Sequence, residues 1–230
     1  MSVLLVMLMF VVVLALSLLL KPKARPEVAA AEVQLRARPA IATQPGTDVP
    51  KAYRFHPCHT WAVDEGSETV RVGLDSFAVR LFEKIERIDI PALNCWIRQG
   101  QNLMTVTADG FVVDFPSPVE GRLTEINRTV VAKPELVTSD PYCDGWLAVI
   151  KSPCFAVDKK NLMQGSIIPH WMRTSEVILQ NMCSQSQAFA QDGGTISRGI
   201  LKRLPPEVRN RVLKEVFMTS AIVHEKNKTR

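Results

Sequence analysis

Hydrophobic and polar positions alternate most regularly in residues 103–121, which read LMTVTADGFVVDFPSPVEG. A turn at Asp109-Gly110 gathers the apolar residues on one face, because successive side chains of a strand point to opposite faces. Asp-Gly is typical of two-residue hairpin turns in which both residues take positive φ. The pattern predicts a β-hairpin whose tip carries no nucleophile. Its expected cross-strand pairs are Ala108 with Phe111, Val106 with Val113 and Met104 with Phe115.

Other short runs of β type continue from Tyr53 to about Lys151, separated by Gly, Pro, Asp and Asn. Short strands at this spacing are typical of a sandwich or a barrel. One helical interruption is expected in DSFAVRLFEKI, where Phe77, Leu81 and Ile85 recur every four residues. The seven predicted strands are TWAV, TVRVGL, IERIDI, NLMTVTA, FVVDF, GRLTEI and GWLAVIK.

The hydrophobic period becomes helical after Cys154. A first helix is predicted to begin with Thr174 or Ser175 as its N-cap and to end at the Asp-Gly-Gly of residues 192–194. Its expected apolar face is formed by Trp171, Ile178, Met182 and Phe189.

A second helix is predicted from Pro206, a residue suited to the first helical turn. Its apolar face comprises Val208, Val212, Leu213, Val216 and Phe217. We expect it to dock on its own domain or on a partner, and the membrane surface is the alternative. The candidate docking residues are Arg209, Arg211, Lys214 and Phe217.

The first twenty residues, MSVLLVMLMFVVVLALSLLL, contain only two polar side chains. A helix of about 20 apolar residues spans the hydrocarbon core of a bilayer. We therefore expect residues 1–21 to form a single membrane anchor, and a cleaved signal peptide with Ala29-Ala30-Ala31 at its cleavage site is the alternative. Representative residues of the predicted anchor are Leu4, Leu5, Phe10, Val13 and Leu18.

Lys21, Lys23 and Arg25 follow this run at once, and no basic residue precedes it. The positive-inside rule then predicts a single-pass protein whose C-terminal domain is cytoplasmic. Residues 22–52 contain five prolines and few large apolar residues, so they are expected to form a linker.

Composition changes this picture in two respects. The chain has 230 residues, 47% of them hydrophobic, which is enough for one ordinary domain with appendages. Basic and acidic residues number 10 and 14 in residues 53–153 but 12 and 6 in residues 154–230. No arginine-rich stripe interleaved with aromatic residues appears, so nucleic acid is not an expected partner.

The middle of the chain resembles the glycine cleavage system H proteins. The resemblance covers about residues 53–165 and rests on four segments, FHPCHTWAV, VRVGLDSFAVRLFEKIERIDIP, SPVEGRLTEIN and PELVTSDPYCDGWLAVIK. It implies a mostly β fold of the lipoyl type, a barrel-sandwich hybrid at residues 53–154. An N-terminal transmembrane helix and a basic helical tail at residues 155–230 complete the expected organisation.

In that family a lysine at the hairpin tip carries lipoate, in a segment close to Glu-Ser-Val-Lys-Ala. Counting from Gly100 and from Gly121 places this lysine at Gly110, and no lysine lies between Lys84 and Lys133. The resemblance therefore implies a member without the lipoyl arm and without a cofactor.

The remaining chemistry-bearing residues are expected to be structural. His56, Cys58 and His59 lack the second ligand pair that a structural zinc site needs, so no metal site is predicted. Adjacent Cys58 and His59 are also poorly placed for a nucleophile pair, since neighbouring side chains of a strand point apart. The five cysteines contain no Cys-x-x-Cys pair, which suits a reducing compartment. Cys95, Cys143, Cys154 and Cys183 are expected to fill apolar space, with accessibility in a surface turn as the alternative for Cys143. A redox role stays open for Cys58 and Cys143.

Three functions stay open at this point. The first is a non-catalytic, membrane-tethered accessory or scaffold subunit that binds other proteins of a membrane-associated complex. The second is a carrier or redox adaptor beside a lipoate- or thiol-dependent enzyme. The third, an export component similar to membrane fusion proteins, lacks their long coiled-coil hairpin.

Overall fold

The computed structural model describes residues 52–184 and 196–218. Both described ranges belong to one compact unit, and residues 1–51, 185–195 and 219–230 lie outside the described residues. The predicted anchor at residues 1–21 and almost all of the predicted linker at residues 22–52 therefore stay untested. Within the described residues, no helix is both long and apolar enough to cross a membrane.

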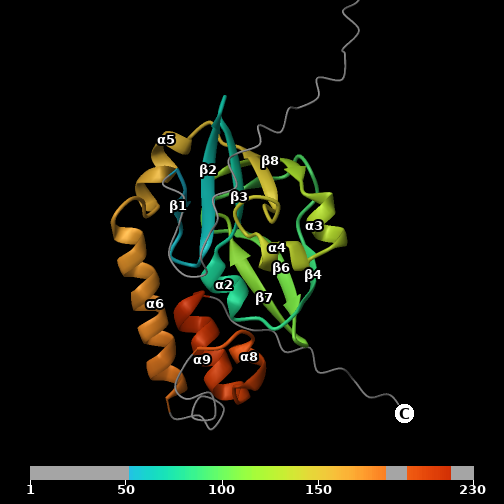
Figure 1. The fold of residues 1–230 in the computed structure, drawn as a ribbon. Coiled ribbons are helices and arrows are strands. Elements are labelled where there is room, and N and C mark those ends of the chain that lie inside the picture. The colour runs from blue at the N-terminus through green and yellow to red at the C-terminus, as the bar shows by residue number, and fades with distance from the viewer. Residues whose placement is uncertain (1–51, 185–195, 219–230) are drawn as a thin grey trace, which may run out of the picture. The chain divides into compact units, whose positions relative to one another are not determined.

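Two antiparallel sheets form the centre of the molecule (Figure 1). The larger sheet has the order β1-β2-β3-β9-β8-β5, and the smaller has the order β4-β6-β7. The strands are β1 (Arg54–Phe55), β2 (Thr60–Gly66), β3 (Thr69–Leu74), β4 (Ile85–Asp89), β5 (Trp96–Ile97), β6 (Asn102–Ala108), β7 (Phe111–Pro116), β8 (Gly121–Ile126) and β9 (Ala148–Lys151).

All seven predicted strands are present, and the fold is mostly β, as expected. The two strands that the sequence did not reveal, β1 and β5, have two residues each. Two residues are too few to show an alternating pattern, so only pairing with a neighbour makes them strands. β1 pairs with β2 and β5 pairs with β8.

Three short helices lie between strands, and the other helices follow the last strand. α2 begins after Asp75, whose carboxylate accepts a hydrogen bond from the Ala78 N–H at 2.8 Å and so caps the helix. The helices are α2 (Ser76–Arg80), α3 (Arg128–Ala132), α4 (Glu135–Ser139), α5 (Phe155–Asp158), the 3-10 turn η1 (Lys159–Asn161), α6 (Ile167–Cys183), α8 (Ile200–Arg203) and α9 (Pro206–Val216).

Two helix predictions within residues 53–151 were wrong. α2 ends at Arg80, and Ile85 already belongs to β4, so the four-residue spacing in residues 77–85 spans two elements. The expectation of a single helical interruption also fails, because α3 and α4 lie between β8 and β9. Five-residue helices are too short for a helical period to appear in the sequence.

α6 begins at Ile167, seven residues before the predicted N-cap at Thr174 or Ser175. Ile168 and Leu179 are both buried, so the apolar stripe of the helix starts before Trp171. The predicted continuation to Phe189 and residues 192–194 lies outside the described residues. α9 begins at Pro206 as predicted and buries Val212, Leu213 and Val216.

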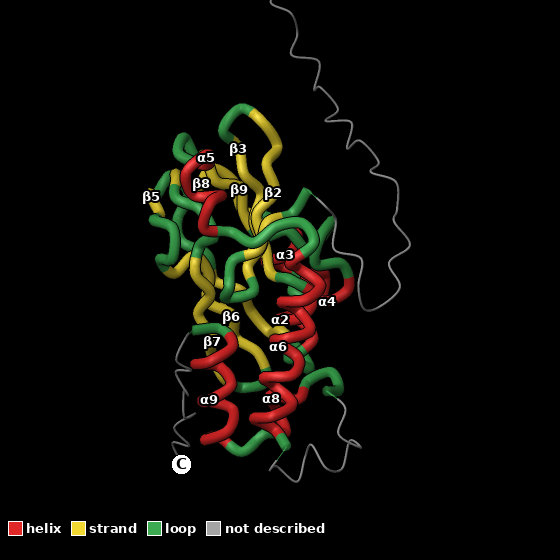
Figure 2. The backbone as a smooth tube through the Cα atoms, turned by 90° about the vertical axis from the view of Figure 1, so that its left-hand side faces the viewer, coloured by secondary structure: helices red, strands yellow, loops and turns green. Residues whose placement is uncertain are grey.

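The C-terminal helices share the core of the sheets, and α9 docks on its own domain, one of the two sites expected from the sequence. α6 lies along the edge of the larger sheet at β1, and α9 packs beside α6 (Figures 1 and 2). The boundary expected at residue 154 therefore does not separate two cores. The buried residues that these helices add to the main cluster include Leu179, Cys183, Ile200, Leu201, Leu204, Val212, Leu213, Val216 and Phe217.

Candidate functional site at the hairpin tip

The β6–β7 hairpin has the register that the sequence predicted. Ala108 pairs with Phe111, Val106 with Val113 and Met104 with Phe115. At the tip both Asp109, with φ of 52°, and Gly110, with φ of 85°, adopt the left-handed conformation. This is the backbone of a primed turn, whose twist matches that of the two strands.

Asp109 fastens the tip to the loop before β4. Its carboxylate accepts hydrogen bonds from the N–H groups of Glu83 at 2.8 Å and Lys84 at 3.0 Å. The Asp109 N–H donates to the Lys84 carbonyl at 3.3 Å. The side chain at the tip is therefore turned back on its own domain.

The loop that receives Asp109 is also the docking point of α8. The Gly199 N–H donates to the Arg80 carbonyl at 3.0 Å, and the Leu201 N–H donates to the Leu81 carbonyl at 3.3 Å. A Cβ atom on Gly199 would lie 2.6 Å from the Glu83 Cβ, so only glycine allows this approach. Residues 80–84 thus connect the hairpin tip to the C-terminal helices.

An exposed ion pair lies at the same place. Lys202 Nζ donates to Glu83 Oε2 at 2.5 Å. This hydrogen bond, together with the Lys202 charge and weaker contributions from Arg203 and Arg198, lowers the pKa of Glu83. The same contact raises the pKa of Lys202. The basic residues of the tail therefore neutralise part of the acidic domain from within the molecule.

The four predicted docking residues differ in their exposure to solvent. Arg211 and Lys214 are exposed on α9. Arg209 is half-buried, with its guanidinium 4.8 Å from the Phe111 ring centroid, a distance suited to a cation–π contact. Phe217 is fully buried. Phe217 was therefore wrongly assigned to partner docking, because its apolar ring is used inside the chain's own core.

His59 occupies a buried polar position between the sheet and the tail. Its Nδ1 lies 2.7 Å from Asp75 Oδ2. Its ring stacks between Phe77 and Trp171, each with its centroid 4.4 Å away. His59 has φ of 63° and precedes β2, so it lies in a turn and not on the strand that the sequence suggested. These contacts make His59 a packing residue.

The other candidates near His59 take local structural roles. His56 Nδ1 accepts a hydrogen bond from the Cys58 N–H at 3.2 Å, and burial lowers the pKa of His56. Burial also raises the pKa of the Cys58 thiol to about 11, which opposes thiolate formation at neutral pH. In residues 52–184 and 196–218, no three His, Cys, Asp or Glu side chains are grouped so that they could hold a metal ion.

The cysteines follow two patterns. Cys58 and Cys183 are buried, and burial raises the pKa of the Cys183 thiol to about 11 as well. Cys143 and Cys154 are exposed, and Cys95 is half-buried. The exposure of Cys154 contradicts its expected role as an apolar filler, whereas the exposure of Cys143 agrees with the surface turn expected there. Cys143 lies in the turn before β9, where its N–H donates to Asp140 Oδ1 at 3.1 Å.

Comparison with known proteins assigns the family. The family model described as glycine cleavage H-protein matches residues 53–174, more than half of the chain. The chain belongs to this family. Its H-protein domain includes both sheets, the hairpin and the first turns of α6, and its fold is the sheet-rich lipoyl type that the resemblance implied.

Curated H proteins resemble this domain over most of their own length. The glycine cleavage system H protein of Prochlorococcus marinus is 34% identical over 120 residues, which are 52% of this chain and 92% of that protein. The one from Aliivibrio fischeri is 35% identical over 101 residues, 44% of this chain and 80% of that protein. A crystal structure of an H protein from Mycobacterium marinum aligns with 24% identity and a TM-score of 0.43 over 46% of this chain and 87% of that one.

The H-protein match ends at residue 174, and the later part of the chain was the least predictable part of the site. α8, α9 and the second half of α6 follow the matched region. No local pattern indicates that Gly199 and Lys202 approach Glu83, because more than a hundred residues separate them from it. The nearest signal is the basic excess of residues 154–230 over the acidic middle of the chain.

Proposed function

We propose that this H-protein family member is a non-lipoylated, non-catalytic binding module that serves as an accessory or scaffold subunit of a membrane-associated complex. The observation that carries the proposal is the hairpin tip. In the family a lysine at this tip carries lipoate, whereas the counts from Gly100 and Gly121 assign the position to Gly110. No lysine occurs between Lys84 and Lys133 that could replace it.

The geometry of the tip supports this proposal. A swinging arm needs a side chain that projects from the domain, but Asp109 bonds back to the loop at residues 83–84 and Gly110 has no side chain. A domain that keeps its packed core but lacks the lipoyl arm can still act by binding other proteins through its surface. Among the described residues, Arg211 and Lys214 are exposed on α9 beside the exposed Glu207 and Glu215, so this surface would offer a partner charges of both signs.

Membrane attachment is the second part of the proposal. It is supported by the apolar run of residues 2–20 and by the basic residues that follow it. A tether of some thirty residues would hold the module at a high effective concentration near membrane partners, so weak contacts would suffice.

Two measurements test the proposal. After co-expression with a lipoate ligase, the intact mass of the full-length chain should lack a lipoyl group, while a family member with the tip lysine, treated identically, should gain one. A tagged chain extracted in mild detergent should retain other subunits. A lipoyl increment would refute the first part, and recovery of the chain alone from membranes rich in it would refute the second.

A surface variant sharpens the pull-down. Deleting the tail would remove buried side chains, so the double substitution Arg211→Glu and Lys214→Glu is preferable. Arg128→Glu with Lys133→Glu changes the same two residue types at exposed positions in and just after α3 and serves as the matched control. Loss of subunits from the first variant alone would locate docking on α9, and equal retention in both would exclude it.

A redox or carrier adaptor is the alternative, and one observation favours it. Cys143 is exposed within the turn before β9. If this thiol carried a group or exchanged disulfides, Cys143→Ser would abolish the adaptor activity with a partner enzyme, whereas Cys154→Ser, at another exposed cysteine, would not.

A further inference from the structure

The hairpin and the loop before β4 form an aromatic surface on the H-protein domain. We define the hairpin face by Phe82, Phe111 and Phe115. The ring centroid of Phe82 lies 6.1 Å from that of Phe111 and 6.5 Å from that of Phe115. All three side chains are at most 2% exposed and belong to the main core cluster. Residues 196–218, here called the C-terminal segment, contact each of them through Phe217 or Arg209.

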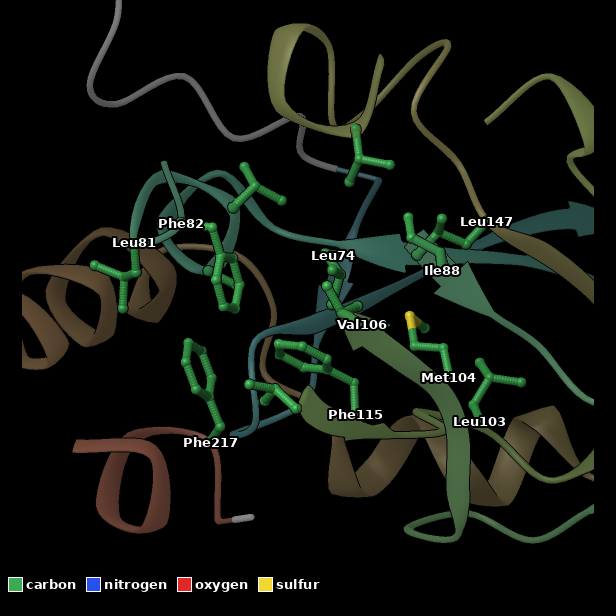
Figure 3. Close-up of a cluster of buried hydrophobic side chains, with 14 of the residues drawn as sticks. Leu74, Leu81, Phe82, Ile88, Leu103, Met104, Val106, Phe115, Leu147 and Phe217 are labelled. Atoms are coloured by element: carbon green, nitrogen blue, oxygen red, sulfur yellow. The ribbon is translucent and has the colours of Figure 1, made fainter. Parts of the chain in front are cut away.

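Phe217 makes the central aromatic contact between the C-terminal segment and the hairpin face. Its ring stacks on Phe82 at 6.5 Å and meets the edge of Phe115 at 5.1 Å, and Figure 3 shows it directed at both. It also meets His59 edge-on at 5.8 Å. A fully desolvated aromatic anchor surrounded by smaller apolar contacts is the usual centre of a strong protein–protein contact.

Polar contacts surround the aromatic anchor. The Arg209 guanidinium lies over Phe111, and the Lys202 ammonium pairs with Glu83. The close approach of Gly199 and the hydrogen bond from Leu201 fix the start of α8 against residues 80–83. An apolar centre with a charged rim is the anatomy of an interface between two proteins.

The face and its cover differ in origin. The hairpin face lies within residues 53–174, the region that matches the H-protein family, while the C-terminal segment follows it. The Prochlorococcus H protein is matched over 92% of its length by 120 residues of this chain. The C-terminal segment is therefore an addition to a domain that is already nearly complete in that relative.

We infer that the hairpin face is a helix-binding surface and that its occupant is the C-terminal segment of the same chain. The surface takes an amphipathic helix with a phenylalanine at its C-terminal end and basic residues at its rim. Because the chain fills the surface itself, the face beside the tip is closed to other proteins while the segment is docked. This inference goes beyond the proposed function and does not depend on which subunits the module binds.

The test separates the occupant from its face while the whole chain is kept. A protease recognition sequence flanked by glycine-serine spacers is inserted between residues 190 and 191 of the full-length protein. After cleavage, native mass spectrometry and gel filtration at micromolar concentration should show that the fragment beginning at residue 191 stays bound. A labelled synthetic peptide of residues 196–218 should then exchange with it.

Phe217→Ala should weaken the binding of the fragment to the rest of the protein about a hundredfold or more, since truncation of a buried phenylalanine has one of the largest free-energy costs of any single substitution. Met218→Ala, at a neighbouring side chain that is 66% exposed, is the matched control and should change retention less than about threefold. The domain left without its fragment should keep its near-UV circular dichroism and bind the added peptide saturably.

Three results would overturn the inference. The fragment could leave the unsubstituted protein at micromolar concentration, or stay equally well in Phe217→Ala. Loss of the near-UV signal when the fragment leaves would show that the segment is an inseparable part of the folding core. Because the assay contains no other subunit and reads no lipoyl mass, its failure would leave the proposed function standing.

Discussion

The approach of Gly199 to the loop at residue 83 gives a prediction with a built-in control. Gly199 has φ of 71°, and a Cβ atom there would lie 2.6 Å from the Cβ and 2.9 Å from the Cα of Glu83. Gly165 has nearly the same φ, 66°, but a Cβ atom there would meet nothing within 4 Å. Alanine at either position therefore introduces similar backbone strain, but only alanine at position 199 also places a Cβ atom against Glu83.

The magnitudes follow from these two terms. A Cβ atom in the left-handed conformation costs about 1–2 kcal/mol, and both variants gain back about 0.4–1 kcal/mol from the restricted unfolded chain. Only Gly199→Ala must also separate α8 from residue 83, and overpacking of this kind costs about 1–3 kcal/mol. We expect Gly199→Ala to lower the free energy of unfolding by about 1–3 kcal/mol more than Gly165→Ala.

Urea unfolding of the full-length protein, followed by tryptophan fluorescence, measures this difference. With a slope of about 2 kcal/mol per molar urea, the midpoint of Gly199→Ala should fall about 0.5–1.5 M below that of Gly165→Ala. Equal midpoints for the two variants would refute the reasoning. They would mean that backbone strain explains both losses and that the contact of the C-terminal segment with the tip loop contributes nothing to stability.

Three further predictions follow from the tip, the buried thiols and the N-terminal segment. Gly110→Lys should gain no lipoyl group by intact mass after incubation with a lipoate ligase. Asp109 still holds the tip on the loop, and the acidic and serine residues that precede the family's lysine are absent. Efficient modification would show that the lysine alone suffices. The free energy of unfolding should fall as pH rises from 9 to 11, because the unfolded chain loses thiol protons that folded Cys58 and Cys183 keep up to a pKa of about 11. Urea titrations of Cys58→Ala should show a shallower fall with pH. An equal dependence of the free energy of unfolding on pH in Cys58→Ala would contradict the burial argument. A cysteine engineered between residues 30 and 50 should resist an impermeant maleimide in intact cells, and rapid labelling there would place the linker outside.

The sequence alone was sufficient for the parts of this protein that depend on local alternation. The register of the hairpin follows from the period of two between Met104 and Phe115 and from the turn residues Asp109 and Gly110, and the structure confirms each pair. The start of α9 at Pro206 was likewise predictable, because proline at the first helical turn is a local signal. The family followed from segments within residues 53–165, which the family match extends to residue 174.

Tertiary structure decided the features that depend on distant residues. Phe217 and Arg211 both lie on or beside α9, but only packing buries the ring of one and leaves the charge of the other exposed. The pairing of Lys202 with Glu83 joins positions 119 residues apart, and no local pattern encodes such a distance. An apolar stripe predicts that one face of a helix is buried, because the hydrophobic effect is non-directional and depends on the apolar area alone. Which surface buries that face depends on the close packing of complementary shapes, which the sequence pattern does not contain.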